Sequence, residues 1–467
     1  MNYKILVNKN NPYQEYLLQN RNLKRIVTES KEEFYLESKT LKAYLDLKKT
    51  LEKINIYITL VSGYRSVEEQ ASLRLEYEQK YGLDYTNNYV ALPSFSEHHT
   101  GLCFDISLVI DGKVSEENDL TAREEAIFRK IHPLLSSFGL ILRYPKDKEE
   151  ITGYSYETWH FRYVGKKTAH IIMENNLTLE EYDNLYNKSG VLVVNKPSML
   201  TSRDVVNKIS NIFDTKKVGH NGTLDPLAEG VLVVTINKAT KINELLISTE
   251  KEYIATVRMG LKTDTLDITG MILATSNLRT TKDELENLFQ KFPREYFQEV
   301  PKYSAVKIEG KKLYEYAREN KEIELPKRLV TIKELELLDF REDTFTFRTV
   351  VSKGTYIRSL INDIGEILAV PCTMEKLIRT RQGNFSIKEA IELDDVKINS
   401  KLISIAEALN IPVKEVLKED SKLVKNGGVV SNKYQIKDRV LFKEHDKALA
   451  IYQVSFHNKL KCFKMLT

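Results

Sequence analysis

The 467-residue chain is poor in cysteine, with only Cys103, Cys372 and Cys462, which lie far apart. An odd number of separated cysteines gives neither a disulfide framework nor a thiolate metal site, which is typical of a reducing compartment. The sequence also lacks a run of 18 apolar residues, which excludes a transmembrane helix. Its first residues lack the apolar core of a secretory signal. We therefore expect a cytoplasmic protein with no membrane contact.

Internal repeats and low-complexity tracts are absent as well, and the length of the chain predicts two or three domains. Charge is unevenly distributed. Of the 70 basic and 66 acidic residues, 24 and 28 lie in residues 1–187, which leaves 46 and 38 in the remainder. The first part is therefore slightly acidic and the second basic, which indicates that only the second part meets a polyanion.

The larger part of the chain is organised around a glycine-rich loop. This loop, Gly219-His220-Asn221-Gly222-Thr223-Leu224-Asp225-Pro226, precedes the apolar run 231–236, as is typical of a tight turn that opens into a strand. Pro226 keeps the backbone of Asp225 extended. A carboxylate fixed in this way can act as a nucleophile or an electrostatic group. A bare Asp-Pro is more often only a turn at a strand entry.

The loop resembles the catalytic motif of the bacterial tRNA pseudouridine synthase B family. Other motifs of that family follow in order, at residues 190–197, 251–253, 260–270, 303–318, 353–358 and 377–379. The resemblance covers residues 188–395 and extends towards the C-terminus. The chain departs from the family pattern at Asn195, where the family has Asp, and near Lys302, where one proline is missing.

This resemblance implies an enzyme that isomerises uridine 55 in the T-loop of tRNA to pseudouridine. It implies Asp225 as the nucleophile, Arg358 as its ion-pair partner, and Tyr253 as the base that stacks on the flipped uracil. The resemblance implies that the enzyme uses neither a metal nor an organic cofactor. From the residues alone, Arg358 could equally be a surface residue and Tyr253 a core aromatic.

Four more residues are implied to meet the RNA or to support the loops around it. They are His220 as a wedge beside the extruded nucleotide, Leu377 and Tyr356 at the uracil pocket, and Lys196 at the loops or the phosphates. For Leu377 a plain core role, and for Lys196 a structural role, stay open.

Two histidines and an aspartate of residues 1–187, taken from two short segments, are candidate metal ligands. His98 and Asp105 lie in residues 96–105, and His160 follows Glu157 by three positions. Two histidines and a carboxylate are enough to hold a catalytic zinc with one open position. Glu157 suits a base that activates water, and Arg65 could stabilise an oxyanion. Each residue taken singly is more often an ordinary surface residue.

Together these segments resemble the VanY-type D-alanyl-D-alanine carboxypeptidases, over residues 1–186. The family pattern Ser-x-His-x-x-Gly-x-Ala-x-Asp falls on residues 96–105, and Glu-x-Trp-His falls on residues 157–160. The resemblance implies zinc held by His98, Asp105 and His160, Glu157 as general base, and D-Ala-terminated peptides or muropeptides as substrates. Cys103 replaces the family's alanine, and we expect it to pack.

His99 is then expected to be a bystander, beside the metal site or at the surface. Enzymes of the VanY type act outside the membrane, whereas this sequence shows no export signal.

We predict an α/β (α+β) fold in three domains. These are an α+β zinc-peptidase-like domain at 1–187, a synthase domain with a mixed sheet at 188–395, and a small RNA-binding domain at 396–467. In the synthase, predicted strands at 191–194, 231–236, 253–259 and 345–351 alternate with predicted helices at 203–213, 282–292 and 358–368. Thr178 and Glu181 predict a capped helix before the first boundary. We expect a monomer.

Three rival hypotheses stay open. The chain could be a cell-wall muropeptide carboxypeptidase with an RNA-binding module, the peptidase half could be a non-catalytic module, or two genes could have fused without a shared mechanism. The complete sets of candidate catalytic residues argue against the first two. We therefore predict a synthase that binds the T-arm of tRNA, joined to a zinc carboxypeptidase.

Overall fold

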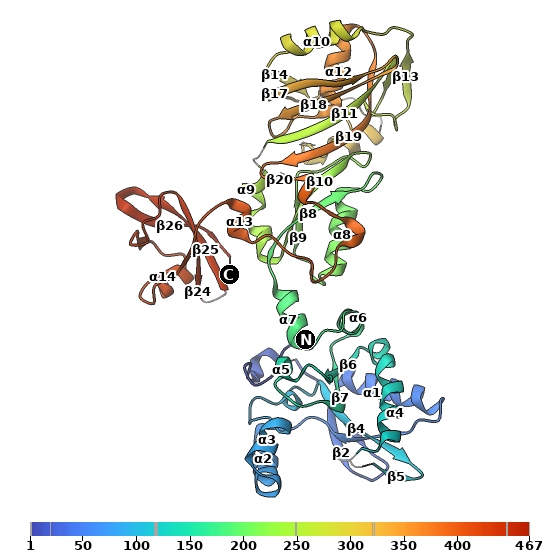
Figure 1. The fold of residues 1–467 in the computed structure, drawn as a ribbon, viewed down its shortest axis with the longest axis vertical. Helices are drawn as coiled ribbons and strands as arrows, with labels where there is room; N and C mark the ends of the chain where they lie inside the picture. Colours follow the sequence, from blue (N-terminus) through green and yellow to red (C-terminus); the bar gives the residue numbers. More distant parts are fainter. Residues whose placement is uncertain are drawn as a thin grey trace. The chain divides into compact units, whose positions relative to one another are not determined.

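The computed structural model describes residues 2–18, 20–115, 120–247, 250–319, 321, 323–444 and 447–466. The chain divides into two compact units, Met1–Asn187 and Lys188–Thr467 (Figure 1). Both units combine helices with sheets, which confirms the predicted mixed class. Within the described ranges, no helix is both long and apolar enough to cross a membrane.

An antiparallel sheet forms the centre of the first unit. Its order is β3 (Ile58–Ser62), β4 (Cys103–Ile110), β7 (Glu157–Tyr163) and β6 (Leu140–Tyr144), with β5 (Lys113–Val114) paired to β4. The register of β4 and β7 sets Asp105 directly opposite His160. Two candidate metal ligands that are far apart in sequence therefore lie side by side.

Helix α1 (Ser38–Glu52) of the first unit buries an apolar stripe. In α1, Ala43, Tyr44, Leu47 and Leu51 are buried and repeat at helical spacing, so they face the sheet core. The helix cap predicted at Thr178 and Glu181 is also confirmed.

The final helix of the unit is α7 (Leu179–Asn187). The Thr178 amide donates to Glu181 Oε2 over 2.8 Å, and the Glu181 amide donates to Thr178 Oγ1 over 3.1 Å.

A ten-stranded mixed sheet forms the main body of the second unit. Its strands run in the order β14 (Glu295–Glu299), β17 (Lys327–Phe340), β18 (Thr344–Val351), β11 (Lys251–Met259), β19 (Cys372–Gln382), β10 (Glu229–Ile236), β8 (Gly190–Lys196) and β21 (Ile391–Glu392), with β9 (Val218–Asn221) on β10 and β20 (Phe385–Ser386) on β19. The four strands predicted here correspond to β8, β10, β11 and β18. Among the strand pairs described in this sheet, β10–β19 and β8–β21 are parallel and the others are antiparallel.

The predicted helices of this unit form α8 (Ser202–Ile212), α10 (Lys282–Lys291) and α12 (Ile357–Leu368). Of these, α10 packs on β17 and α12 on β19 (Figure 1). The start of α12 lacks a side-chain cap from Tyr356, whose amide instead donates to Gln298 Oε1 over 2.8 Å. Gln298, a buried residue of β14, thus fixes the N-terminus of α12, the helix that carries Arg358.

Strands β8 and β10 each contain a continuous apolar run, at 191–194 and 231–234, because both of their faces are covered. Leu192 and Val234 belong to the core beneath the large sheet, whereas their neighbours Val193 and Val233 belong to a second cluster. That second cluster also contains Ile451 and other residues of the C-terminal sheet. The alternation explains why these strands read as continuous hydrophobic runs.

The C-terminal sheet has the order β22 (Val413–Glu415), β24 (Arg439–Glu444), β25 (Lys447–Ser455), β26 (Lys459–Met465) and β23 (Val430–Ser431). Val396 and Leu402, which the sequence assigned to the C-terminal domain, are buried in the core of the large sheet instead. The separate sheet therefore starts after residue 412, and its RNA-binding role stays a prediction.

Gly230 is required where β10 lies between β8 and β19. Its φ is +100°, and a Cβ placed there would lie 2.3 Å from the Arg379 carbonyl oxygen. Gly310 also has a positive φ, of +84°, but no atom lies within 4 Å of the corresponding Cβ position. An alanine at Gly310 would therefore meet backbone strain alone, whereas an alanine at Gly230 would meet both strain and a steric clash.

We expect Gly230→Ala to destabilise the protein by more than about 4 kcal/mol, because strain and a backbone clash combine. Gly310→Ala should cost only the left-handed strain, about 1–2 kcal/mol. Thermal and denaturant unfolding of both variants measures the difference. Equal losses of stability would show that β10 and β19 move apart easily.

Candidate active sites

The loop that carries Asp225 is held by buried side chains of the second unit. The Lys196 ammonium is fully buried and donates to the carbonyls of Pro197, Leu200 and Pro226 over 2.8, 2.6 and 3.2 Å. Burial lowers the pKa of Lys196 to about 8, although the carboxylates of Glu229 and Asp225 favour its charged form. This geometry favours loop support over contact with phosphates.

A second clamp comes from Arg379, which sequence reasoning left without a role. Its side chain is fully buried and donates from Nε to the Val231 carbonyl over 2.7 Å and from Nη2 to the Gly222 carbonyl over 2.9 Å. A buried arginine is rare without partners, yet nothing in the local sequence distinguishes it from an exposed one. It joins the loop to β10 and β19.

Asp225 lies against Arg358 at the start of α12. Arg358 Nη2 lies 3.0 Å from Asp225 Oδ1, and Arg358 Nε lies 2.8 Å from Oδ2. The guanidinium also donates to the carbonyls of Thr265 and Tyr303, over 2.9 and 3.0 Å. Arg358 is only 5% exposed, whereas the Asp225 side chain is 31% exposed. The arginine is therefore fixed inside the protein while the carboxylate stays accessible.

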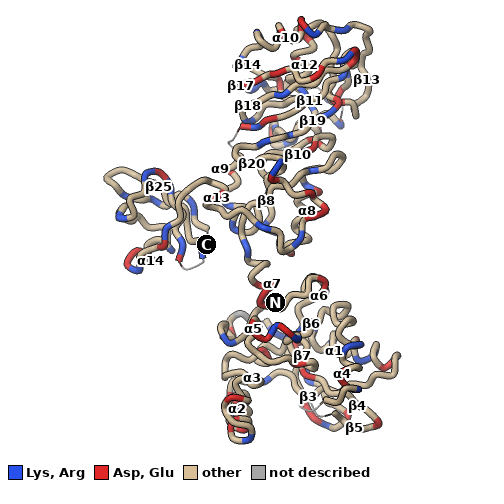
Figure 2. The backbone as a smooth tube through the Cα atoms, viewed as in Figure 1, with Lys and Arg blue, Asp and Glu red and all other residues tan. Residues whose placement is uncertain are grey.

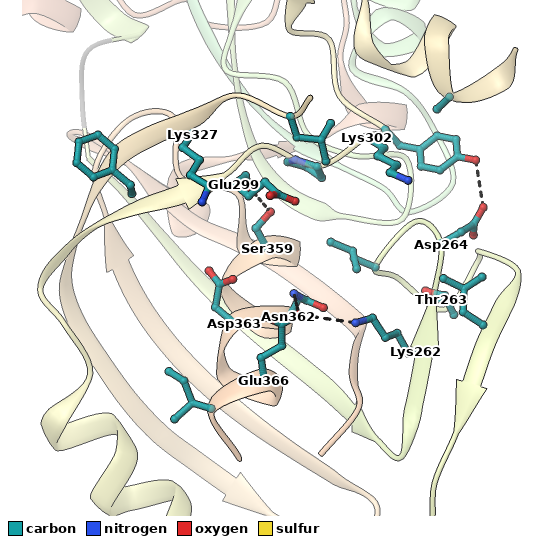
Figure 3. A pocket seen from close by; sticks show the side chains of 18 of the residues that line it. Lys262, Thr263, Asp264, Glu299, Lys302, Lys327, Ser359, Asn362, Asp363 and Glu366 are labelled. Carbon is teal, nitrogen blue, oxygen red and sulfur yellow. Dashed lines mark hydrogen bonds and ion pairs between the residues drawn. The ribbon is translucent and has the colours of Figure 1, made fainter. Parts of the chain in front are cut away.

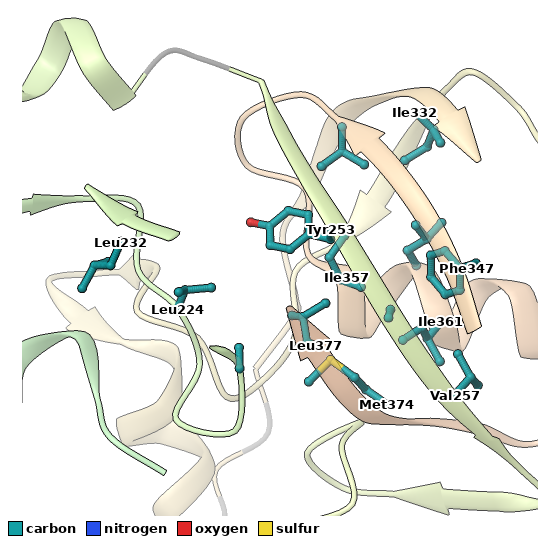
Figure 4. Close-up of a cluster of buried hydrophobic side chains, with 14 of the residues drawn as sticks. Leu224, Leu232, Tyr253, Val257, Ile332, Phe347, Ile357, Ile361, Met374 and Leu377 are labelled. Carbon is teal, nitrogen blue, oxygen red and sulfur yellow. The ribbon is translucent and has the colours of Figure 1, made fainter. Parts of the chain in front are cut away.

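The aromatic candidate Tyr253 projects from β11 towards the segment that carries Leu224, the residue before Asp225 (Figure 4). Tyr253 is 7% exposed, and Leu377 on the neighbouring strand β19 is 5% exposed. Both belong to the core cluster beneath the large sheet. They offer an apolar wall beside the loop.

The other two candidates are Tyr356 and His220. Tyr356 ends the turn before α12, and burial raises its pKa. His220 lies on β9, where burial and the nearby cations Arg379 and Arg203 lower its pKa, so it is neutral near pH 7. A neutral, half-buried ring next to the loop can stack in a gap without a charge penalty.

A cavity of about 1070 Å³ lies beside α12, the helix that carries Arg358 (Figure 3). It is lined by Ser359 of α12, by Tyr303 and by Asp264, and the Tyr303 hydroxyl donates to Asp264 Oδ2 over 3.1 Å. Its lining includes neither Asp225 nor Tyr253. The candidate site therefore opens beside the large cavity rather than within it.

In the first unit, His98, Asp105 and His160 converge. His98 Nδ1 lies 2.7 Å from the Gly63 carbonyl, which leaves Nε2 directed at Asp105 Oδ2, 3.3 Å away. His160 Nδ1 lies 3.0 Å from Asp105 Oδ1 and 3.4 Å from Glu157 Oε2. Each histidine thus has one ring nitrogen beside the Asp105 carboxylate.

These residues fit a bound divalent cation. Asp105 Oδ1 is buried and has no hydrogen-bond partner within the described residues, although His160 Nδ1 is close. Two imidazoles and a carboxylate that approach without hydrogen-bond geometry are the donor set of a zinc site. The backbone bond of His98 fixes the ring orientation that such a ligand needs.

The pocket around this cluster has a volume of about 250 Å³ and is also lined by Glu157 and Arg65. Burial raises the pKa of Glu157. Arg65 donates to Gln70 Oε1 and to Ser62 Oγ, both over 2.8 Å. The five predicted residues of this site therefore line one pocket.

His99 lies apart from the ligand cluster. It is buried, its Nδ1 lies 2.8 Å from the Arg65 carbonyl, and its Nε2 accepts from the Ser94 amide over 3.2 Å. It holds two backbone segments in place.

Sequence reasoning gave no role to Glu97, a buried residue whose carboxylate lies beside His160. Arg143 Nε and Arg162 Nη1 donate to Glu97 Oε1 over 2.8 and 2.7 Å, and all three side chains are at most 1% exposed. Glu97 Oε2 lies 3.7 Å from His160 Nε2. Burial opposes ionisation of Glu97, but the two guanidinium groups outweigh it and hold its pKa well below the usual range.

Comparisons with known proteins match the two units to different families. Residues 210–357 match the family model described as TruB family pseudouridylate synthase (N terminal domain), and residues 33–166 match the model described as D-alanyl-D-alanine carboxypeptidase. A tRNA pseudouridine synthase B of Geobacillus thermodenitrificans is 43% identical over 257 residues, which cover 52% of this chain and 85% of that protein.

Another tRNA pseudouridine synthase B, from Francisella philomiragia, is 39% identical over 277 residues, which cover 57% of this chain and 92% of that protein. Among solved structures, the vancomycin-resistance D,D-pentapeptidase VanY in complex with Zn(II) is 31% identical. That match covers 39% of this chain and 100% of the VanY chain, with a TM-score of 0.34.

Replacing Glu97 tests the buried ion cluster. Glu97→Gln leaves Arg143 and Arg162 without their shared carboxylate, so we expect a loss of about 3–5 kcal/mol of stability at pH 7. Because the folded pKa is below the unfolded value of about 4.3, this contribution is present above pH 4.3 and disappears as the pH falls further. Thermal unfolding from pH 3 to pH 8 measures it.

Glu33→Gln is the matched control, because Glu33 forms an exposed ion pair with Arg25. We expect this change to leave the melting temperature almost unaltered. If the two variants unfold alike at pH 7, the ion cluster does not stabilise the unit.

Proposed function

The chain belongs to the tRNA pseudouridine synthase B family, and we propose that Asp225 is the nucleophile with which it converts the T-loop uridine at position 55 of tRNA to pseudouridine. The observation that carries this proposal is the contact between Arg358 and Asp225. A buried guanidinium binds both oxygens of a carboxylate that is still accessible to a ligand. Such a carboxylate is oriented and ready to attack.

The reaction breaks the bond between N1 of uracil and C1′ of the ribose, and forms a bond between C5 and C1′. The uridine must leave its stack to reach the loop, at a cost of a few kcal/mol. Asp225 attacks C1′ as the bond from C1′ to N1 breaks, and it is released when C5 bonds to C1′. Tyr253 stacks on the uracil and takes the proton from C5, and N1 of the product carries a proton in its place. Leu377 and Tyr356 line the base, and His220 fills the place that the nucleotide vacates. These steps use side chains alone.

Binding of the T-arm is supported by charge. Residues 188–467 carry 46 basic and 38 acidic residues. Figure 2 shows the Lys and Arg positions of this unit spread over several strands and loops rather than confined to one element. A distributed positive surface suits a folded RNA, whose phosphates supply most of the affinity. The cytoplasm is where such a substrate is found.

A nucleophile cannot be replaced by its amide. We expect Asp225→Asn to fold and bind tRNA but to lose more than about 10⁴-fold in rate, beyond the 10²–10⁴-fold that a general acid or base contributes. Single-turnover tritium release from a uridine-labelled tRNA transcript measures this, and mapping of the product gives the modified position.

Asp394→Asn is the matched control, because Asp394 is 90% exposed in the same unit. It should leave the rate unchanged. Arg358→Met should be inactive as well, since the carboxylate loses the cation that orients it and balances its charge. Slow but clear turnover by Asp225→Asn would remove Asp225 from the role of nucleophile.

We also propose that the first unit is a zinc carboxypeptidase for peptides that end in D-alanine, such as muropeptides. The convergence of His98, Asp105, His160 and Glu157 on one pocket favours it. His98 Nε2, His160 Nδ1 and Asp105 would hold the ion, which activates water as a Lewis acid. Glu157 takes the proton of the attacking water and returns it to the leaving amine, and Arg65 stabilises the oxyanion.

Glu157→Gln separates metal binding from hydrolysis. We expect this variant to keep one zinc per chain and to release D-alanine from a D-Ala-D-Ala peptide at least about 10²-fold more slowly, because the water loses its base. Elemental analysis and a D-alanine assay measure the two properties. Glu150→Gln, at an exposed position, should change neither, and loss of zinc in Glu157→Gln would make Glu157 a ligand.

A further inference from the structure

Cys103 occupies the position at which the VanY-type pattern has alanine. It begins β4 and lies two residues before Asp105. Because side chains alternate along a strand, Cys103 and Asp105 point to the same face of the sheet. Cys103 is fully buried, so packing alone could explain it. Its neighbours indicate more.

The Cys103 sulfur lies close to two of the predicted ligands, His98 and His160. One nitrogen of His98, one nitrogen of His160 and Cys103 Sγ all lie within 4.8 Å of one another. In a tetrahedral zinc site with bonds of about 2.0–2.3 Å, neighbouring ligand atoms are separated by about 3.5 Å. Small side-chain rotations would therefore bring all three to one ion.

A second observation points to the same centre. Asp105 Oδ1 is buried without a hydrogen-bond partner within the described residues, and it faces His160 Nδ1 at 3.0 Å. The cluster thus contains an unsatisfied anionic oxygen as well as a sulfur, on the same face of the same strand. A metal ion bound at this centre would satisfy this oxygen, and the Cys103 sulfur lies close to the two histidines of the same centre.

We propose that Cys103 Sγ is a fourth protein ligand, as thiolate, of the metal centre formed by His98, Asp105 and His160. The proposal rests on the zinc site described above. Sulfur ligands favour soft or borderline ions such as zinc over magnesium and calcium. Four protein ligands are typical of closed zinc sites, whereas a catalytic site keeps one position for water. Cys103 therefore strengthens metal binding and competes with the attacking water for the fourth position, so hydrolysis is slower than with an alanine at this position.

Cobalt substitution tests the sulfur ligand without an activity assay. The full-length protein is loaded with Co²⁺ in place of zinc, and its absorption spectrum is recorded. We expect a sulfur-to-cobalt charge-transfer band in the near ultraviolet in the wild type and in Cys372→Ala. Cys372 is the matched control, because it is a buried free cysteine outside the metal cluster.

Cys103→Ala should still bind cobalt but lose this band. Its metal affinity, measured by competition with a chelator, should fall at least about tenfold, since even partners outside the ligand set contribute 10–100-fold. A wild-type spectrum equal to that of Cys103→Ala would overturn the sulfur ligand and leave the zinc site in place. Failure of the wild type to bind any cobalt or zinc would instead reject the metal site itself.

Discussion

The second unit depends on one buried charge, the guanidinium of Arg358. A buried arginine needs acceptors for its donors, because it cannot lose its proton. The carbonyls of Thr265 and Tyr303 and the carboxylate of Asp225 accept hydrogen bonds from its two Nη atoms, and Nε forms an ion pair with the same carboxylate. The segments that contain these three acceptors are far apart in sequence. Satisfying one cation therefore fixes the relative positions of a helix, a loop and the candidate nucleophile.

The same logic explains the shell of cations around the Asp225 loop. Lys196 and Arg379 are both fully buried, and both bind backbone carbonyls of that loop or its flanks. Backbone carbonyls that would otherwise face the core find donors in this way. The part of the loop that follows β9 is thus held by side chains rather than by a helix or strand, and its partly exposed Asp225 carboxylate lies next to Arg358. Preorganisation of this kind is what a covalent mechanism requires.

Much of this could be predicted from the sequence, and the limits have physical causes. The apolar runs of β8, β10 and β11 and the cap at Thr178 were visible because they depend on local periodicity and local hydrogen bonds. The pairing of Asp105 with His160 was not, because register between distant strands is set by tertiary packing. Burial of Lys196 was also invisible, since lysine is almost never fully buried. The resemblance to known motifs supplied the candidate sites, whereas Glu97, Arg379 and the position of the Cys103 sulfur needed coordinates.

The two candidate sites each place an aspartate beside cationic or basic groups, but with different chemistry. Asp225 faces an arginine, which stays charged at any accessible pH, so its partner is permanent and needs no ion. Asp105 faces two histidines, which balance its charge only when protonated. Neutral imidazoles are instead the commonest metal ligands in proteins. The choice of arginine or histidine opposite an otherwise similar carboxylate therefore explains why the Asp105 site fits a metal ion, whereas Asp225 already has a fixed cation beside it.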